Sequence, residues 1–302
     1  MPANTSPLGA LPARFRRSRL LIVGCGDVGL RVARQLPPRV RVLALTSSPA
    51  RVSALRAQGL TPLLGDLDQP ATLARLAGLA ARVLHLAPPP GEGSDDPRTR
   101  ALLRALRRRT PPLALVYGST SGVYGDCAGR WVHETTPLQP QTARARRRAA
   151  AESEVRLHGR RARSSILRIP GIYAPDRPGG TPRERLLRGT PVLAPEDDVY
   201  TNHIHADDLA RACIAALWRG RAQRVYHASD DTQLKMGDYF DLAARLYGLP
   251  APRRISRAQA ERELPETLLS FLRESRRLDN GRLKKELRLK LRYPTVREGL
   301  AS

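Results

Sequence analysis

The sequence predicts an α/β protein with a doubly wound parallel sheet and a small, mostly helical C-terminal lobe. Two observations lead to this fold class. Short apolar runs alternate with segments of helical periodicity as far as residue 169, and the earliest apolar run ends in a cluster of glycines. Regular alternation of this kind is typical of parallel strands joined by right-handed helical crossovers.

The individual elements follow from these patterns. The first strand, residues 20–23, is a buried apolar run, and the helix after it, residues 27–36, stops at Pro37 and Pro38. Proline cannot continue a helix, because it lacks the backbone N–H and its ring clashes with the preceding turn. The same reasoning predicts strands at residues 40–45, 60–64, 83–87, 113–117 and 165–169, and helices at residues 49–58, 71–79, 99–109 and 143–158.

Beyond Gly171 the alternation loosens. Loops rich in Pro and Gly at residues 175–182 precede short helices near 183–187 and 207–218, a late strand at 225–227 and a charged, mostly helical end. We therefore expect a disordered tail at residues 1–18, a dinucleotide-binding core at 19–175, and a substrate-side lobe at 176–302 that is interleaved with the core.

The glycine cluster GCGDVG, residues 24–29, lies between the first strand and the first helix. In a Rossmann fold, Gly24 would allow the tight turn, Gly26 would let the backbone approach a pyrophosphate, and Gly29 would let helix and strand pack closely. The first helical residues, Asp27 and Val28, offer backbone N–H groups that favour a phosphate. The loop therefore predicts a dinucleotide site; a purely structural glycine turn is the alternative.

The end of the second strand indicates which dinucleotide is bound. Enzymes that use NAD commonly place a carboxylate here, on the ribose 2′-hydroxyl. This chain has Thr46, Ser47 and Ser48 instead, followed by Arg51. Hydroxyl and guanidinium groups suit a 2′-phosphate, so NADP is favoured over NAD. The alternative for Arg51 is a solvated helix residue.

Two further strand ends complete the predicted cofactor site. Asp66 follows the third strand and is placed to meet the adenine, although it could also cap the next helix. Ala87 and Pro88 follow the fourth strand and are placed to line the cofactor between pyrophosphate and nicotinamide, unless Pro88 only terminates the strand.

Several short motifs in a fixed order give the chain a resemblance to a known family. Together with the glycine loop, they are GDL at residues 65–67, YGSTSGVYG at 117–125, WVHETTP at 131–137, ILRIPGIY at 166–173 and HIHADDLA at 203–210. The chain resembles the extended, atypical short-chain dehydrogenases/reductases of the NAD-dependent epimerase/dehydratase superfamily. The resemblance adds Leu67 to the cofactor site and implies an enzyme, an oxidoreductase or epimerase acting on a small molecule.

The same resemblance implies an acid–base centre, from which this chain departs. The family uses a Ser or Thr after the fifth strand, matched by Thr120, and a Tyr-x-x-x-Lys pair on the following helix. Alignment on Glu152 puts Arg144 in the Tyr position and Arg148 in the Lys position. Because arginine stays protonated, Arg144 cannot be the base. It could clamp an anionic substrate or a developing oxyanion, and Arg148 could replace the lysine as a cation and ribose donor.

Other groups could supply acid–base chemistry. Tyr124, His133, Glu134 and Tyr173 are expected near the pocket, but packing or exposure explains each of them equally well. His203 and His205, followed by Asp207 and Asp208, have ligand types that suit a metal. The resemblance instead implies that the aspartates cap a helix beginning near Ala206, so no metal is expected.

The formal net charge of +24 raises the question of a nucleic-acid partner. Only four of the 52 basic residues are lysines, an arginine excess that codon usage in a GC-rich genome would produce. The arginines of the helix at 143–158 and just beyond it could contact phosphates, but we interpret them as a solvated helix face with Glu152 and Glu154 interspersed. They are Arg144, Arg146, Arg147, Arg148, Arg156, Arg160, Arg161 and Arg163.

The cysteine content and the hydropathy of the chain indicate where the protein is located and what it binds. The three cysteines are widely spaced, and no apolar run approaches the length of a membrane span. We expect a cytoplasmic protein that can form a homodimer and that binds a small molecule and neither nucleic acid nor membrane. Because the Tyr-x-x-x-Lys pair is missing, a non-catalytic redox sensor or scaffold that holds the dinucleotide is the alternative function.

Overall fold

The structure is a computed structural model that describes residues 18–159 and 162–302. Its centre is a seven-stranded sheet in which every neighbouring pair is parallel. In spatial order the strands are β3 (Thr61–Leu64), β2 (Val40–Thr46), β1 (Ser18–Val23), β4 (Arg82–His85), β5 (Ala114–Thr120), β7 (Ser164–Ile169) and β11 (Arg224–His227). The order runs outward from β1 in both directions, which confirms the doubly wound sheet.

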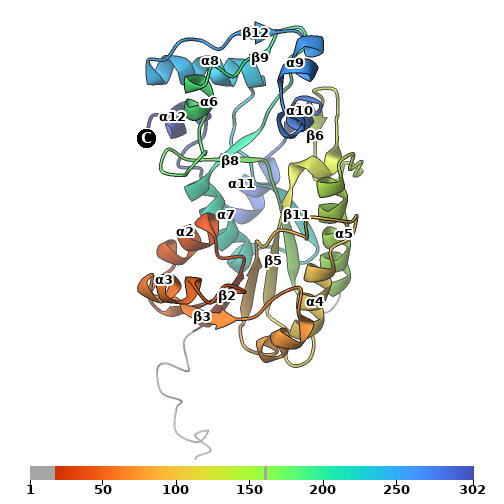
Figure 1. Ribbon diagram of the computed structural model, residues 1–302. Coiled ribbons are helices and arrows are strands. Elements are labelled where there is room, and N and C mark those ends of the chain that lie inside the picture. Colours follow the sequence, from red (N-terminus) through yellow and green to blue (C-terminus); the bar gives the residue numbers. More distant parts are fainter. Residues whose placement is uncertain (1–17, 160–161) are drawn as a thin grey trace, which may run out of the picture.

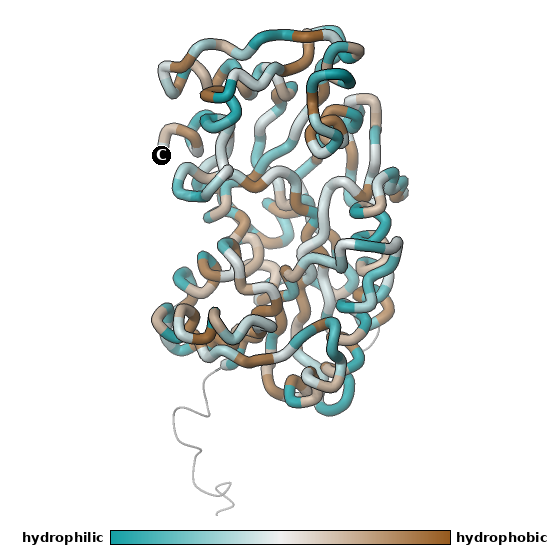
Figure 2. Tube along the Cα trace, viewed as in Figure 1, coloured by the Kyte–Doolittle hydropathy of each residue, from teal (hydrophilic) through white to brown (hydrophobic). Residues whose placement is uncertain are grey.

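Helices cover both faces of this sheet because alternate side chains of each strand point to opposite faces. Leu20 and Ile22 of β1 join the apolar cluster of one face, and Leu21 and Val23 join that of the other. The first face carries α2 (Asp27–Gln35), α3 (Arg51–Ala57), α7 (Ala206–Arg219) and α11 (Gly281–Leu287); the second carries the 3-10 helix η1 (Pro70–Leu76), α4 (Pro97–Leu106) and α5 (Ala143–His158). Figure 2 shows the apolar segments concentrated inside this part of the molecule.

The predicted helices and strands of the core are present, with two differences. The segment predicted as an α-helix at residues 71–79 is the 3-10 helix η1, which starts at Pro70 and is followed by Gly78 at φ +68°. At its start, the carbonyl oxygen of Gln69 accepts from both the backbone N (3.0 Å) and Oγ1 (2.7 Å) of Thr72, a local i,i+3 arrangement that competes with α-helical hydrogen bonds. The late strand predicted at 225–227 falls in the segment that we assigned to the lobe. In the structure it is β11, which pairs with β7 and extends the main sheet.

A second layer of structure lies over the carboxyl ends of the strands (Figure 1). Three pairs of short parallel strands belong to it: β8 (Gly171–Tyr173) with β10 (His203–His205), β9 (Val192–Leu193) with β12 (Arg254–Ile255), and β6 (Trp131–Val132) with β13 (Arg277–Leu278). Its helices are α6 (Arg183–Leu187), α8 (Met236–Tyr247), α9 (Arg257–Glu263), α10 (Glu266–Leu272) and α12 (Val296–Leu300). The division into a core at 19–175 and a lobe at 176–302 stays a prediction.

The predicted tail at residues 1–18 lies outside the described residues, except that Ser18 begins β1. Among the helices of the described ranges, none combines the length and the apolar character needed to cross a bilayer.

Candidate active site

The glycine loop between β1 and α2 has the geometry that its sequence predicts. Gly24 has φ +84°, and a Cβ there would lie 2.3 Å from the backbone N of Ala87 at the end of β4. A Cβ at Gly29 would lie 3.2 Å from Cγ2 of Ile22, so helix and strand touch at this point. A Cβ at Gly26 would meet nothing within 4 Å. The loop is therefore tight on two sides and open above Gly26.

The N-terminus of α2 faces this opening. Gly26 is the N-cap residue and provides no side chain to cap the helix. The first backbone N–H groups of an α-helix have no partner within the helix and carry a partial positive charge. A phosphate group would fit here, because the opening above Gly26 leaves room for it.

Arg31 of α2 holds the loop to distant parts of the chain. Its guanidinium forms hydrogen-bonded ion pairs with Asp27 (3.0 Å), Asp176 (2.6 Å) and Asp207 (2.7 Å), and only 6% of its side chain is exposed. Asp176 follows β8, and Asp207 lies in the first turn of α7. One buried guanidinium thus fixes the glycine loop, the segment after β8 and the start of α7 relative to one another.

The end of β2 presents hydroxyl groups and one guanidinium. Thr46 is buried and accepts a hydrogen bond from the backbone N of Ser48 (3.2 Å), whereas Ser47 is exposed. Nη2 of Arg51 donates to the carbonyl oxygen of Cys25 (2.7 Å). Arg51 therefore reaches back to the glycine loop, which a merely solvated helix residue would not do.

The other predicted cofactor residues lie at the carboxyl ends of β3 and β4. Asp66 Oδ1 accepts from the backbone N of Asp68 (3.0 Å), while Gln69 is the N-cap residue of η1, so Asp66 does not cap that helix. Leu67 packs against the apolar cluster on the α4 side of the sheet. The backbone N of Ala87 donates to the carbonyl oxygen of Val23 (3.0 Å), which ties the end of β4 to β1. Pro88 is exposed at the same edge.

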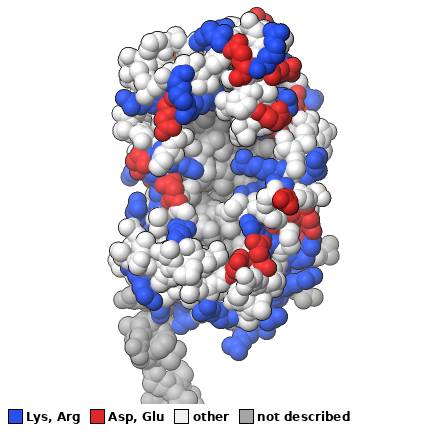
Figure 3. All heavy atoms as spheres, viewed as in Figure 1, with Lys and Arg blue, Asp and Glu red and all other residues white. Residues whose placement is uncertain are grey.

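A cavity of about 580 Å³ lies between the end of β5 and the overlying lobe. Figure 3 shows this face of the molecule hollowed between its two parts. Thr120 and Arg144 both line the cavity, whereas Arg148 does not. The structure thus brings together two of the three residues that the sequence predicts to be catalytic.

Thr120 ends β5 and begins the short 3-10 helix η2 (Ser121–Tyr124). Its Oγ1 accepts a hydrogen bond from the backbone N of Gly122 (3.3 Å). Within the described ranges this hydroxyl does not donate its own proton to any protein group. A hydroxyl held in this way can donate its proton to an oxygen atom in the cavity.

Arg144 lies in the first turn of α5, which begins where Thr142 Oγ1 accepts from the backbone N of Ala145 (3.1 Å). Its side chain is solvent-accessible and makes no hydrogen bond or ion pair with the part of the chain that the structure describes. Partial burial and the charges of Arg148 and Arg147 lower its pKa. A guanidinium nevertheless stays protonated at neutral pH, so Arg144 presents an unpaired positive charge to the cavity.

Arg148 lies one turn further along α5 and turns toward β5. Its Nη1 donates to the Tyr117 hydroxyl (3.0 Å) and to the carbonyl oxygen of Gly118 (2.8 Å). Burial raises the pKa of Tyr117 to about 12, although the nearby positive charge of Arg148 opposes this shift. The Arg148 charge is therefore held against the strand and not at the cavity wall.

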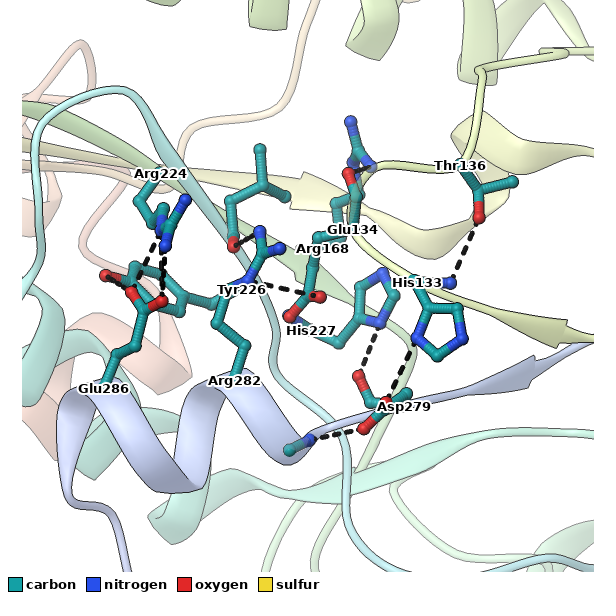
Figure 4. Close-up of polar contacts among 12 residues, drawn as sticks. His133, Glu134, Thr136, Arg168, Arg224, Tyr226, His227, Asp279, Arg282 and Glu286 are labelled. Carbon is teal, nitrogen blue, oxygen red and sulfur yellow. Dashed lines mark hydrogen bonds and ion pairs between the residues drawn. The ribbon is translucent and has the colours of Figure 1, made fainter.

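Three of the four side chains expected near the pocket do not line the cavity. Tyr124 is buried, and its hydroxyl lies 2.6 Å from Nε2 of His227. His133 is exposed and lies 3.1 Å from Asp279. Glu134 is buried, accepts from the backbone N of His227 (3.4 Å) and lies 3.5 Å from Nε of Arg282 (Figure 4). Tyr124 lies in the YGSTSGVYG motif, and His133 and Glu134 lie in WVHETTP, which suggested that all three are close to the pocket. In the fold, η2 and β6 place them outside the lining of the cavity.

Tyr173 lines the cavity, as expected, but its hydroxyl donates to the carbonyl oxygen of Thr295 (3.3 Å). Sequence reasoning missed Tyr239 and did not place His203 in the cavity. Their rings lie at the cavity wall with centroids 4.2 Å apart, tilted by 41°. Burial lowers the pKa of His203 to about 3, so its ring is neutral. No motif could have revealed Tyr239, since α8 brings it to the cavity from a region without motifs.

The His and Asp residues after β10 have structural contacts. The imidazole Nδ1 of His205 accepts from the backbone N of Asp207 (3.2 Å) and thereby caps α7. Asp208 is fully buried and accepts from the backbone N of Arg292 (2.9 Å) and of Tyr293 (2.8 Å). The expectation that the aspartate pair caps α7 was therefore wrong, because the preceding histidine takes the capping position.

A buried ion pair lies directly behind the end of β5. Arg168 of β7 bonds Glu152 of α5 through Nη2 (2.7 Å) and Nε (3.0 Å), and each side chain is 1% exposed. The Ser119 hydroxyl also donates to Glu152 (2.7 Å), and Arg168 donates to the Tyr124 hydroxyl. The pair joins α5, β5, β7 and η2 under Thr120.

The expectation of a solvated arginine-rich face on α5 was wrong for part of this face. Glu152 is buried in the ion pair, and Arg147 is buried and donates to the carbonyl oxygen of Gly93 (2.8 Å). Both residues face the core because the helix packs on β5 and β7. Arg160 and Arg161 lie outside the described residues.

Removing one member of the buried pair should destabilise the fold. We expect Glu152→Ala to lower the free energy of unfolding by about 3–5 kcal/mol, because Arg168 is left buried without its counter-ion. Glu154→Ala is the matched control: Glu154 belongs to the same helix but forms a half-exposed pair with Arg100, worth about 1 kcal/mol or less. Urea denaturation measures both. Equal losses in the two variants would contradict the assignment.

Comparison with known proteins agrees with this architecture. The NAD dependent epimerase/dehydratase family matches residues 20–229. A conserved protein of unknown function from Silicibacter pomeroyi is 31% identical, with a TM-score of 0.78 over 94% of this chain and 97% of that one. No protein with a curated description matches the sequence.

More distant structures share the fold. UDP-glucose 4-epimerase from Thermotoga maritima, with UDP-glucose, is 18% identical, with a TM-score of 0.76 over 94% of this chain and 96% of that one. UDP-glucuronic acid 4-epimerase from Bacillus cereus, in complex with NAD, is 17% identical, with a TM-score of 0.73 over the same shares. The family match spans more than half of the chain, and the chain therefore belongs to the NAD dependent epimerase/dehydratase family.

Proposed function

We propose that this protein is an NADP-dependent oxidoreductase or epimerase-like enzyme that acts on a small metabolite and uses Thr120 and Arg144 at its active site. One observation carries the proposal. The opening above Gly26, at the uncapped start of α2, lies at the same edge of the sheet as the cavity lined by Thr120 and Arg144. A dinucleotide laid across this edge would have its phosphates at one end and its reactive ring at the other.

The residues that would hold the cofactor follow the strand ends. Gly26 and the backbone of Asp27 and Val28 would meet the pyrophosphate. The predicted adenine and linker contacts are Thr46, Ser47, Arg51, Asp66, Leu67, Ala87 and Pro88. The complex of NAD with the Bacillus cereus epimerase of the same fold supports a nicotinamide cofactor.

NADP is favoured by the charge at the end of β2. Of the described residues, no acidic side chain follows β2 before α3, and the guanidinium of Arg51 is held beside the glycine loop by its bond to Cys25. A 2′-phosphate near this position would gain a charge-assisted hydrogen bond, and a carboxylate that would repel it is missing from this segment.

The bound nicotinamide would supply or accept a hydride. The chain itself would then bind the substrate oxygen: Thr120 donates a hydrogen bond to it, and Arg144 stabilises negative charge that develops on it. Arg144 cannot take up a proton at neutral pH, so it acts as a fixed charge. Arg148 is held 2.8 Å from the carbonyl oxygen of Gly118, so it adds positive charge below the site.

The glycine loop provides a test of cofactor binding. We expect Gly26→Ala to lower the affinity for NADPH at least tenfold, because its Cβ enters the space reserved for the phosphates. Its loss of stability should stay below about 1 kcal/mol, the cost of alanine at an N-cap position. Gly24→Ala is the contrasting variant. Its φ of +84° and its 2.3 Å approach to Ala87 should destabilise the fold by more than about 1 kcal/mol. Thermal melts and NADPH fluorescence titrations separate the two effects; unchanged NADPH affinity in Gly26→Ala contradicts the proposal.

The preference for NADP should depend on Arg51. We expect Arg51→Gln to weaken NADPH binding about tenfold or more and to leave NADH binding unchanged, because only the 2′-phosphate is lost as a partner. Arg56→Gln, exposed on the same helix, is the control and should change neither affinity. Isothermal titration of the native chain and both variants with NADPH and NADH measures these affinities. A native protein that binds NADH as tightly as NADPH would contradict the preference for NADP.

Arg144 should be required for turnover. We expect Arg144→Gln to lower kcat/KM about 100-fold while the affinity for NADPH stays constant, as for the loss of an oxyanion donor. Arg146→Gln is the control, because Arg146 points away from the cavity and bonds Gln141 at the start of the same helix. Consumption of NADPH with a panel of carbonyl substrates is the measurement, and equal rates in both variants would exclude a role for Arg144.

A non-catalytic sensor or scaffold is the second candidate, favoured by the fixed position of Arg148 and by the lack of a phenol at position 144. The double variant Arg144→Tyr/Arg148→Lys distinguishes the candidates. Turnover that appears only in this variant indicates that the native site binds the cofactor without chemistry.

A further inference from the structure

Arginine dominates the charged residues that line the cavity. Arg144, Arg177, Arg185 and Arg276 contribute guanidinium groups, and Glu274 is the single carboxylate among the lining residues that the structure describes. Arg144 belongs to α5, which packs on the sheet, whereas Arg185 belongs to α6 in the overlying lobe (Figure 1). The cavity therefore has positive charge on two opposing walls.

Two of these arginines already have acidic partners. Arg276 pairs with Glu274 (2.7 Å) and also donates to the carbonyl oxygen of Gly125. Arg177 lies 3.8 Å from Asp27 of the glycine loop. Their charges are offset by the protein, so neither requires a ligand.

Arg185 differs from both. Its guanidinium carbon lies 4.4 Å from the centroid of the Phe240 ring, so the aromatic ring covers one of its faces. Its side chain forms no hydrogen bond or ion pair with any described residue, and its Nε, like Nε of Arg276 and Nη1 of Arg177, is buried without a hydrogen-bond partner. A stacked guanidinium keeps its N–H donors along its edge, and Arg185 is one of the residues that line the cavity.

Codon usage does not explain this arrangement. It would account for solvated arginines such as Arg183 and Arg188, which are exposed on either side of Arg185. Arg185 itself is largely covered, and burial together with the charge of Arg188 lowers its pKa. A guanidinium that is partly removed from water and has no counter-ion would be stabilised by a bound anion.

We propose that Arg185 anchors an acidic group of the substrate, a carboxylate or a phosphate monoester, on the lobe side of the cavity. The planar fork of the guanidinium can bind either group through two parallel hydrogen bonds. The acidic group would hold the substrate so that its reacting oxygen lies near Thr120 and Arg144 on the other wall. This inference rests on the proposed function and names the substrate class of the same site.

The test measures anion binding to the full chain saturated with NADP at constant ionic strength. Inorganic phosphate and succinate are titrated separately by isothermal calorimetry, since they represent the two acidic groups, and glycerol is the neutral control. We expect one of the anions to bind, and Arg185→Gln to weaken its affinity at least tenfold. Arg185→Lys, which keeps the charge but loses the fork, should lie between the two. Arg183→Gln, exposed on the same helix, should bind like the native chain.

The identity of the anion that binds in an Arg185-dependent manner decides between carboxylate and phosphate. The inference is overturned when the native chain binds neither anion, or when Arg185→Gln with an unchanged melting temperature binds them as tightly as the native chain.

Failure of the proposed function has a different signature. NADP affinity is measured first, and a chain that does not bind NADP refutes the cofactor assignment. The anion titrations are then run on the chain alone, and only the part of the binding that Arg185→Gln removes is counted. This subtraction excludes phosphate bound at the start of α2.

Discussion

The buried pair between Glu152 and Arg168 is the interaction on which the site depends. It has almost no contact with solvent and lies where α5 crosses β5 and β7. Because residues four apart share a helix face, fixing Glu152 also fixes the orientation of Arg148 and Arg144, one and two turns earlier. Arg148 therefore meets β5, and Arg144 reaches the cavity beyond the strand end. Burying two charges is tolerated here because Ser119 and Tyr124 also bond to them.

Much of the fold could be predicted from local patterns. The strands of a parallel sheet are buried on both faces, so they are visible as continuous apolar runs, and Pro37 and Gly59 mark where their flanking helices stop. The steric roles predicted for Gly24, Gly26 and Gly29 agree with the space that surrounds each glycine in the structure. The strands of two or three residues in the lobe, such as β9 and β12, are too short to show any periodicity and could not be predicted.

The candidate site was less predictable, because its geometry depends on contacts between distant segments. The spacing of Arg144 and Arg148 gave their order on α5 but not that one faces the cavity and the other faces β5. Tyr124 is close to Thr120 in the sequence, yet the turn of η2 places its hydroxyl against His227. Arg185 and Tyr239 come from parts of the chain without motifs, so only the folded arrangement shows that they share a cavity with Thr120.

The three carboxylates around Arg31 have a consequence for how the molecule is assembled. Only Asp27 is close to Arg31 in sequence; Asp176 and Asp207 are added to the chain much later. A fragment that ended at residue 175 would leave the guanidinium with one partner and would remove β11 from the edge of the sheet. The last ion-pair partner of Arg31, Asp207, consequently becomes present only after two thirds of the polypeptide has been synthesised. A fragment of residues 19–175 would therefore lack two of the three ion pairs of Arg31, and with them the ties from the glycine loop to the segment after β8 and to α7.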